Sequence, residues 1–374
     1  MGKCIIVPNI SYSLNNLGQL LGIDENILYG KAIIIRNVSF ASNNLGQITF
    51  IDEPIGPTGA TEPVGPTGET GQTGPIEPDY STQYFTIESL ADSNTITAVK
   101  SGSGKSPVIY YSLDDGETWN NLTLSSGTIT FGTINTGDKI IFKSTISNWA
   151  TAYNQYNRFN GSKNFKVYGN AMSLLNGDDF INNSEFTTGS SFNLCGLFYR
   201  TTTIIDASNL ILPATTLYES SYNGTFRECS NLVNGPKLLP ALDVPKDGYS
   251  SMFEACTKLV EGPEILATSV SGDAALKNMF CMNRNSKVTA AMTKSPILRI
   301  TNPSSYGNVY QQLFCGNGNI TEVTILAEGT NLSFTNWLNN VSSTGVIKTL
   351  SGTTFTSGNY GVPSGWTTED YVEN

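Results

Sequence analysis

The sequence of 374 residues contains no histidine. This absence excludes Ser-His and Cys-His nucleophile arrangements and every histidine-bound metal site. The six cysteines include no C-x-x-C pair, so neither a zinc site nor a redox pair is expected. Only chemistry based on carboxylates stays open to an enzyme, and we expect a protein that has no catalytic activity and no cofactor.

Charge is also scarce, since charged residues make up only 14% of the chain and the formal net charge is -10. Proteins bind nucleic acid and anionic membranes largely through Lys and Arg, so neither is an expected partner. No window approaches the apolar run of a membrane span, and the first ten residues, MGKCIIVPNI, hold an apolar patch of only three. We therefore expect a protein that is made in the cytoplasm and has no contact with membranes.

The sequence has 39% hydrophobic residues and many Asn, Ser, Thr and Gly residues. This composition is typical of turn-rich β structure, and the length favours several folded units. The expected fold class is mainly β and multidomain.

An internal duplication occupies the first expected domain, residues 1–55. ISYSLNNLGQLLGIDE at 10–25 returns as VSFASNNLGQITFIDE at 38–53, with nine of sixteen positions identical. Each copy predicts two short strands joined by an Asn-Asn-Leu-Gly turn. The turn residues are Asn15, Asn16 and Gly18 in the first copy, and Asn43, Asn44 and Gly46 in the second.

Collagen-like triplets follow at residues 56–78. Three polyproline-like chains wind together only where every third residue lacks a side chain, so the pattern predicts a homotrimer. Seven triplets at roughly 3 Å per residue would form a stalk about 60 Å long. A flexible linker is the alternative, but it predicts irregular glycine spacing. The glycines are Gly56, Gly59, Gly65, Gly68, Gly71 and Gly74, and Glu62 replaces one without a shift in register.

Residues 79–165 predict a β-sandwich, because short β-type runs alternate with turn residues. Within them, SLDDGETW at 112–119 matches the Asp-box pattern S-x-D-x-G-x-T-W. Sialidases carry such boxes far from their catalytic residues, so one copy indicates a hairpin and no activity. Its residues are Ser112, Asp114, Gly116, Thr118 and Trp119, of which the last is expected to anchor the hairpin in the core.

A period of about 27 residues runs through the last expected domain, residues 166–374. An aromatic or leucine precedes each recurring apolar residue by four positions, which predicts a single helical turn in each unit. One turn and one short strand cannot bury themselves, so the units are expected to stack into a solenoid. The predicted core contains Phe198, Phe226, Phe253, Phe280 and Phe314, with Cys195, Cys229 and Cys256 packed beside it.

YNGTFRECSNLVNGPKLLPA and YSSMFEACTKLVEGPEILA resemble the BspA-type leucine-rich repeat, although Cys281 and Cys315 are shifted to the position just after the phenylalanine. The order of the four segments is similar to that of virion fibre proteins of gut Bacteroidales phages, most closely the trimeric head fibres of crAss-like phages. The resemblance implies a virion protein whose N-terminus binds the major capsid protein or another head protein. It also implies that the C-terminal domain binds carbohydrate or protein on the host surface.

Three other functions stay open at this point. A tail fibre would carry the same segments, and a bacterial BspA-like surface adhesin would carry the same solenoid. A fibre-borne depolymerase would need an acid and a base, for which the adjacent pairs Asp114/Asp115 and Asp178/Asp179 are the candidates.

Overall fold

The computed structural model describes residues 79–373 except 103, 154, 304 and 305, together with four short strands nearer the N-terminus. The chain forms two compact units, Met1–Pro75 and Ile76–Asn374. With 31% of the residues in strands and 5% in helices, the expected mainly β class is confirmed.

Each copy of the duplicated sequence in the first unit contains one pair of antiparallel strands. β1 (Tyr12–Leu14) pairs with β2 (Leu20–Gly22), and β3 (Phe40–Ser42) pairs with β4 (Ile48–Phe50). The strands of the second copy lie at the same relative positions as those of the first. The six predicted turn residues and the whole collagen-like segment lie outside the described residues.

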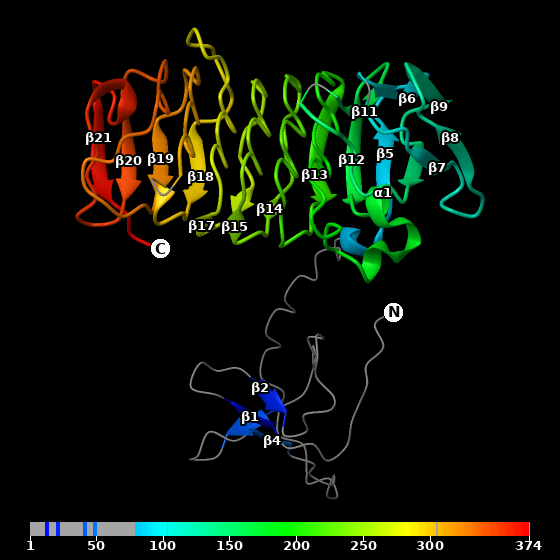
Figure 1. Cartoon of the computed structure of the whole chain (residues 1–374), viewed down its shortest axis with the longest axis horizontal. Coiled ribbons are helices and arrows are strands. Elements are labelled where there is room, and N and C mark those ends of the chain that lie inside the picture. The colour runs from blue at the N-terminus through cyan, green and yellow to red at the C-terminus, as the bar shows by residue number, and fades with distance from the viewer. Residues whose placement is uncertain are drawn as a thin grey trace, which may run out of the picture. The chain divides into compact units, whose positions relative to one another are not determined.

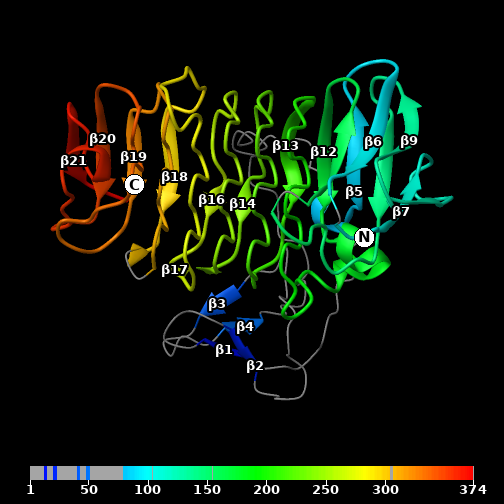
Figure 2. The ribbon, with the colours of Figure 1, turned by 45° about the horizontal axis from the view of Figure 1, so that its top comes forward.

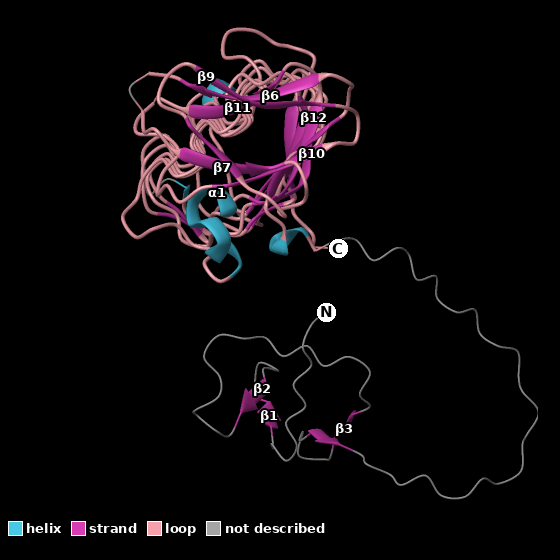
Figure 3. Cartoon of the chain, turned by 90° about the vertical axis from the view of Figure 1, so that its right-hand side faces the viewer, coloured by secondary structure: helices cyan, strands magenta, loops and turns pink. Residues whose placement is uncertain are grey.

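Two sheets open the second unit. One has the strand order β13-β12-β5-β10-β7-β8, and the other has the order β11-β6-β9. Between the sheets, the ring centroid of Phe159 lies 5.1 Å from that of Phe85 and 4.9 Å from that of Phe142, and Phe131 lies 4.9 Å from Phe142. The two sheets therefore share one apolar core. Figure 3 shows strands of both sheets. The bounds are β5 (Phe85–Ser89), β6 (Asn94–Lys100), β7 (Val108–Ser112), β8 (Asn120–Thr123), β9 (Thr128–Ile134), β10 (Lys139–Lys143), β11 (Asn157–Gly161), β12 (Phe165–Asn170) and β13 (Ile204–Ile211).

The first sheet changes from antiparallel to parallel at β12, which pairs antiparallel with β5 and parallel with β13. β12 also spans the boundary expected at 165/166. Helix α1 (Ser173–Asn176) and the 3-10 helix η2 (Gly177–Ile181) lie between β12 and β13 along the chain. From β13 onward the strands follow one another in a row that ends at β21 (Figure 1).

Parallel pairing continues along this row (Figure 2). β14 pairs with β16, β15 pairs with β17, and β18 to β21 form one four-stranded sheet. Bridges from Asp206 to Asn234 and from Asn234 to Glu261 link the earlier repeats in the same direction. The bounds are β14 (Leu238–Leu239), β15 (Asp243–Val244), β16 (Glu264–Ile265), β17 (Ser269–Val270), β18 (Lys294–Leu298), β19 (Glu322–Ile325), β20 (Gly345–Thr349), β21 (Trp366–Asp370) and the 3-10 helix η4 (Gly358–Tyr360).

A second set of hydrogen bonds joins the repeats through what we call the turn segments, residues 192–201, 219–229, 246–256, 273–282 and 308–317. Within each segment, backbone N–H groups alternate between two kinds of acceptor. Tyr222 and Phe226 donate to Gly248 and Met252 of the next segment, whereas Thr225 donates three residues back, to Tyr222. The segments therefore form a ladder of their own, in addition to the strand ladder.

The prediction of a single helical turn in each unit is wrong. A residue with left-handed backbone recurs every fourth position, as at Asp247, Ser251 and Ala255, where φ is 55°, 56° and 61°. Such residues interrupt a helix, and the segments are runs of consecutive β-turns. The residues four apart still bury their side chains together, because Tyr249 and Phe253 are both fully buried.

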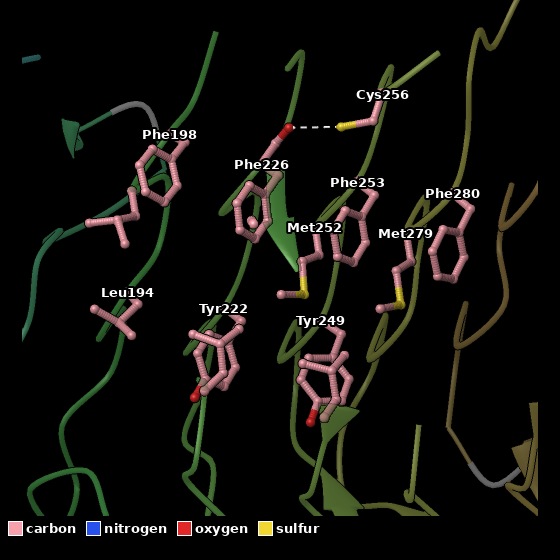
Figure 4. Close-up of a cluster of buried hydrophobic side chains, with 14 of the residues drawn as sticks. Leu194, Phe198, Tyr222, Phe226, Tyr249, Met252, Phe253, Cys256, Met279 and Phe280 are labelled. Atoms are coloured by element: carbon pink, nitrogen blue, oxygen red, sulfur yellow. Dashed lines mark hydrogen bonds between the residues drawn. The ribbon is translucent and has the colours of Figure 1, made fainter. Parts of the chain in front are cut away.

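Aromatic rings of successive repeats lie in rows within the buried core (Figure 4). The rings of Phe198, Phe226, Phe253, Phe280 and Phe314 follow one another at centroid distances of 5.3, 5.4, 5.6 and 5.5 Å. The angles between the last three pairs of rings are 2°, 3° and 6°. All five residues predicted as the repeat core therefore lie in the core, in one continuous row.

Candidate functional site

The second unit fixes the chain where the collagen-like segment ends. The 3-10 helix η1 (Tyr80–Thr82) is capped by Asp79, and the Asn170 side-chain amide donates to the Ser81 carbonyl at 3.0 Å. The Tyr80 ring packs edge-on against Tyr168, with centroids 5.5 Å apart. These contacts hold the chain in place beside β12 from Asp79 onward.

An open cavity of about 480 Å³ lies at this entry point. Tyr80 lines it together with Leu212, Leu238 and Pro240. Leu238 is 41% exposed and Leu242, at the next strand start, is 59% exposed. Exposed apolar side chains therefore lie near η1, the first described element of the second unit.

The Asp-box residues close the hairpin of β7 and β8. The Asp114 carboxylate accepts hydrogen bonds from the Ser112 hydroxyl (2.6 Å), the Thr118 hydroxyl (2.6 Å) and the Thr118 N–H (2.9 Å). These bonds, the one from Ser112 first, lower the pKa of Asp114 to about 2. Gly116 has φ +96°, a backbone conformation that residues with a side chain rarely adopt.

The expectation that Trp119 anchors this hairpin in the core is wrong. Trp119 is only half-buried, and the Lys143 ammonium lies 3.9 Å from its ring centroid. The same ammonium lies 2.7 Å from an Asp178 carboxylate oxygen, which also accepts from the Tyr84 hydroxyl at 2.7 Å. Lys143 thus forms an ion pair with Asp178 at the surface, and the Trp119 ring covers the ammonium of this pair.

The two adjacent acid pairs are engaged in local structure and are not arranged as a catalytic acid and base. Hydrogen bonds from Lys143 and then Tyr84 lower the pKa of Asp178. Asp114 and Asp178 are therefore both held as carboxylates, whereas a general acid needs a raised pKa. Asp115 pairs with Lys139 at 2.7 Å, and the Asp179 carbonyl accepts the backbone N–H of residues 182 and 183.

Sequence reasoning placed three cysteines beside the repeat core, and two of them, Cys229 and Cys256, belong to it. Cys195 instead packs with Ala150 and Tyr156 in a separate small cluster. Cys195, Cys229 and Cys256 are fully buried, and the Cys256 thiol donates to the Phe226 carbonyl at 3.0 Å (Figure 4). Burial raises the pKa of all three thiols. Sequence reasoning missed the disulfide between Cys281 and Cys315, whose separation of 34 residues gives no local signal.

Sequence reasoning also missed a cavity of about 370 Å³ that crosses three turn segments. Its lining includes Asn223, Ser250 and Lys277, which occupy equivalent positions at intervals of 27 residues. The period of 27 residues could have revealed this cavity, because residues at equivalent positions of stacked repeats lie side by side in a line. We call this cavity the turn-side groove.

Comparison of the chain with protein-family models, curated proteins and solved structures gives no match. Among the helices of the described part of the chain, none is long and apolar enough to cross a membrane. No cluster of acidic or sulfur ligands suited to a metal ion occurs within that part either.

Proposed function

We propose that the protein is a homotrimeric virion fibre whose second unit is an adhesion head. The observation that carries the proposal is the glycine period, which ends at Gly74, a few residues before Asp79 caps the first 3-10 helix of the second unit. Triplets of this kind have a physical reason only in a three-chain helix, because just one residue type fits at its axis. One stalk would then carry three heads.

The architecture of the second unit supports the role of a head. Two hydrogen-bonded ladders and a continuous row of phenyl rings hold successive repeats in a fixed register. We assign this stack to the BspA-type leucine-rich-repeat solenoids, on the motif with phenylalanine and cysteine at residues 226–229 and 253–256. A solenoid offers an extended surface, and three copies on one stalk raise a weak affinity through effective concentration.

The exposed apolar surface at the entry point fits the same arrangement. In a trimer, the exposed apolar side chains of one copy, Leu238 among them, would be covered in part by another copy. The duplicated N-terminal module would hold the other end of the stalk on the capsid, as the resemblance to head fibres implies.

The first test is the molar mass of the full-length chain, measured by light scattering. We expect three times the chain mass of 40.3 kDa. Gly68→Ala puts a side chain at the axis and is expected to lower the temperature at which the trimer dissociates. Thr67→Ala, which leaves every glycine in place, serves as the matched control and should have a smaller effect.

A single chain in solution, or equal effects of the two substitutions, would contradict the trimeric stalk. Antibody against the C-terminal domain, applied to purified particles, tests membership of the virion separately. Label on the heads supports a head fibre and label on the tails a tail fibre. Label confined to bacterial envelopes would favour a surface adhesin.

A further inference from the structure

The turn-side groove is formed by residues that are distant in the sequence. Asn223 and Arg227 come from one turn segment, Ser250 and Ser251 from the next, and Lys277 and Asn278 from a third. Tyr153 and Tyr156 come from the loop before β11, and Arg284 follows the third segment. The groove thus depends on the stacking of three repeats, and the turn ladder fixes its floor.

Cations outnumber anions in the groove, although the whole protein is acidic. The Glu254 side chain is 9% exposed and lies between two guanidinium groups. One of its oxygens is 3.0 Å from Arg227 Nε, and the other is 2.6 Å from Arg284 Nη2. Arg227 Nε also lies 3.6 Å from a Glu228 oxygen, and Glu228 pairs with Arg200 at 2.7 Å. The cluster thus holds three guanidiniums and two carboxylates and carries a net positive charge.

Lys277 adds a further positive charge to the groove. No carboxylate within the described part of the chain forms an ion pair with its ammonium. Among the described residues that line the groove, Asp247 is the acid, and its carboxylate accepts a hydrogen bond from the Tyr153 hydroxyl at 2.5 Å. An anion placed near Lys277 would therefore meet a cation that has not been neutralised.

Tyr153 supplies an aromatic face at the edge of the groove. Its side chain is 44% exposed, yet the ring is held edge-on by Phe192 at a centroid distance of 5.4 Å. The bond to Asp247 fixes the other end of the side chain. A ring that is exposed and also held in place provides a flat apolar surface at little cost in conformational entropy.

An unpaired acceptor lies in the floor. Asn278 is 3% exposed, and its side-chain oxygen has no hydrogen-bond partner among the residues that the structure describes. A buried polar atom without a partner destabilises the fold, because it has lost its hydrogen bonds to water. A ligand that brings a hydroxyl group to this oxygen would remove that cost.

We propose that the turn-side groove binds a saccharide that carries a carboxylate group, such as a uronic acid residue of a surface polysaccharide. Lys277 and the two guanidiniums would hold the carboxylate, the Asn278 oxygen and the Asp247 carboxylate would accept hydroxyl groups, and the apolar face of a sugar ring would pack on Tyr153. The role in adhesion rests on the proposed function, but the binding itself does not depend on it.

Calorimetric titration of the full-length protein with trigalacturonate, and with the neutral trisaccharide maltotriose, tests the proposal. We expect tighter binding of the acidic sugar and a loss of affinity at high salt. Lys277→Gln should weaken trigalacturonate binding about tenfold, because it removes a charge-assisted hydrogen bond that solvent and salt partly screen. Tyr153→Ala should weaken the binding of both sugars, because it removes the packing surface and leaves the cations in place.

Lys258→Gln is the matched control, since it removes one exposed lysine of the neighbouring repeat that does not line the groove. Equal losses from the two lysine substitutions, equal binding of the two sugars, or no binding of trigalacturonate would each overturn the proposal. Light scattering on the same samples separates this failure from a failure of the trimeric fibre. A trimer that binds no acidic sugar would refute only the assignment of the ligand.

Discussion

The row of phenyl rings makes Phe253 the most informative position for a test of the stack. Its ring is fully buried and lies between those of Phe226 and Phe280, at 5.4 and 5.6 Å. Phe253→Ala removes both ring contacts and leaves a cavity, so we expect a loss of about 3–5 kcal/mol in the free energy of unfolding. Phe253→Leu keeps most of the apolar volume and should cost about 1–3 kcal/mol for the two lost ring pairs.

A glycine beside this ring allows a double-mutant cycle. A Cβ atom at Gly235 would lie 3.0 Å from Phe253 Cε1, so Gly235→Ala alone should destabilise the stack by about 1–3 kcal/mol through overpacking. Once Phe253 has been replaced by leucine, the methyl group has more room. The double variant should then lose at least about 0.5 kcal/mol less than the sum of the two single losses.

Urea denaturation of the full-length chain, followed by the fluorescence of the buried Trp149 and Trp337, provides the assay. Val260→Ala is the control, since Val260 lies in the same repeat and is 46% exposed; it should cost less than about 0.5 kcal/mol. If Phe253→Ala costs no more than Val260→Ala, the row of rings does not hold the repeats together.

Three further predictions concern single positions. Ala255 has φ 61°, so Ala255→Gly should increase the free energy of unfolding by up to about 1 kcal/mol. Gly224 has φ 59°, so Gly224→Ala should decrease the free energy of unfolding by a similar amount. A change of the opposite sign in either variant would contradict the left-handed turns. Tyr310→Phe should leave the midpoint unchanged or raise it, because the buried hydroxyl has no partner among the described residues, and a large loss would mean that one exists. Hydrogen bonds, the one from the Ser112 hydroxyl first, lower the pKa of Asp114 from 3.8 to about 2. The contribution of this carboxylate to folding stability is therefore complete above pH 3.8 and is lost as the pH falls through about 2. When stability is measured against pH in acid, Asp114→Asn should remove this pH-dependent contribution and no other.

The core positions of the stack could be predicted from the sequence because they obey a simple constraint. One large apolar side chain for each repeat must meet its equivalents in the neighbouring repeats, so its spacing of about 27 residues is visible without a structure. Phe226, Phe253 and Phe280 follow this rule and stack nearly parallel. The Asp-box hairpin was predictable for a similar reason, since all its bonds lie within a few residues of one another.

The conformation of the turn segments could not be predicted in the same way. A spacing of four residues is typical of a helix, and the residues that adopt left-handed backbone include Glu228, Ser251 and Ala255, which give no glycine signal. What fixes these residues is the next repeat, whose carbonyls accept every second N–H. The same dependence on neighbours hid the Cys281–Cys315 pair and the turn-side groove, because each forms only when adjacent repeats are in register.

The alternation of hydrogen bonds also affects how the adhesion head that we propose could change its ligand. The turn ladder uses backbone groups, and the row of rings uses one side chain for each repeat, so residues at the phase of Asn223, Ser250 and Lys277 take no part in the ring stacking. Substitutions there change the charge and hydrogen-bonding groups of the groove while both ladders and the row of rings stay intact. Asn223 and Ser250 are nearly buried, at 7% and 4% exposure, so the half-buried Lys277 is the position where a change of ligand would cost little stability. We therefore expect Lys277→Gln to alter sugar binding with almost no change in the denaturation midpoint. Phe253→Leu should lower the denaturation midpoint and leave sugar binding almost unchanged.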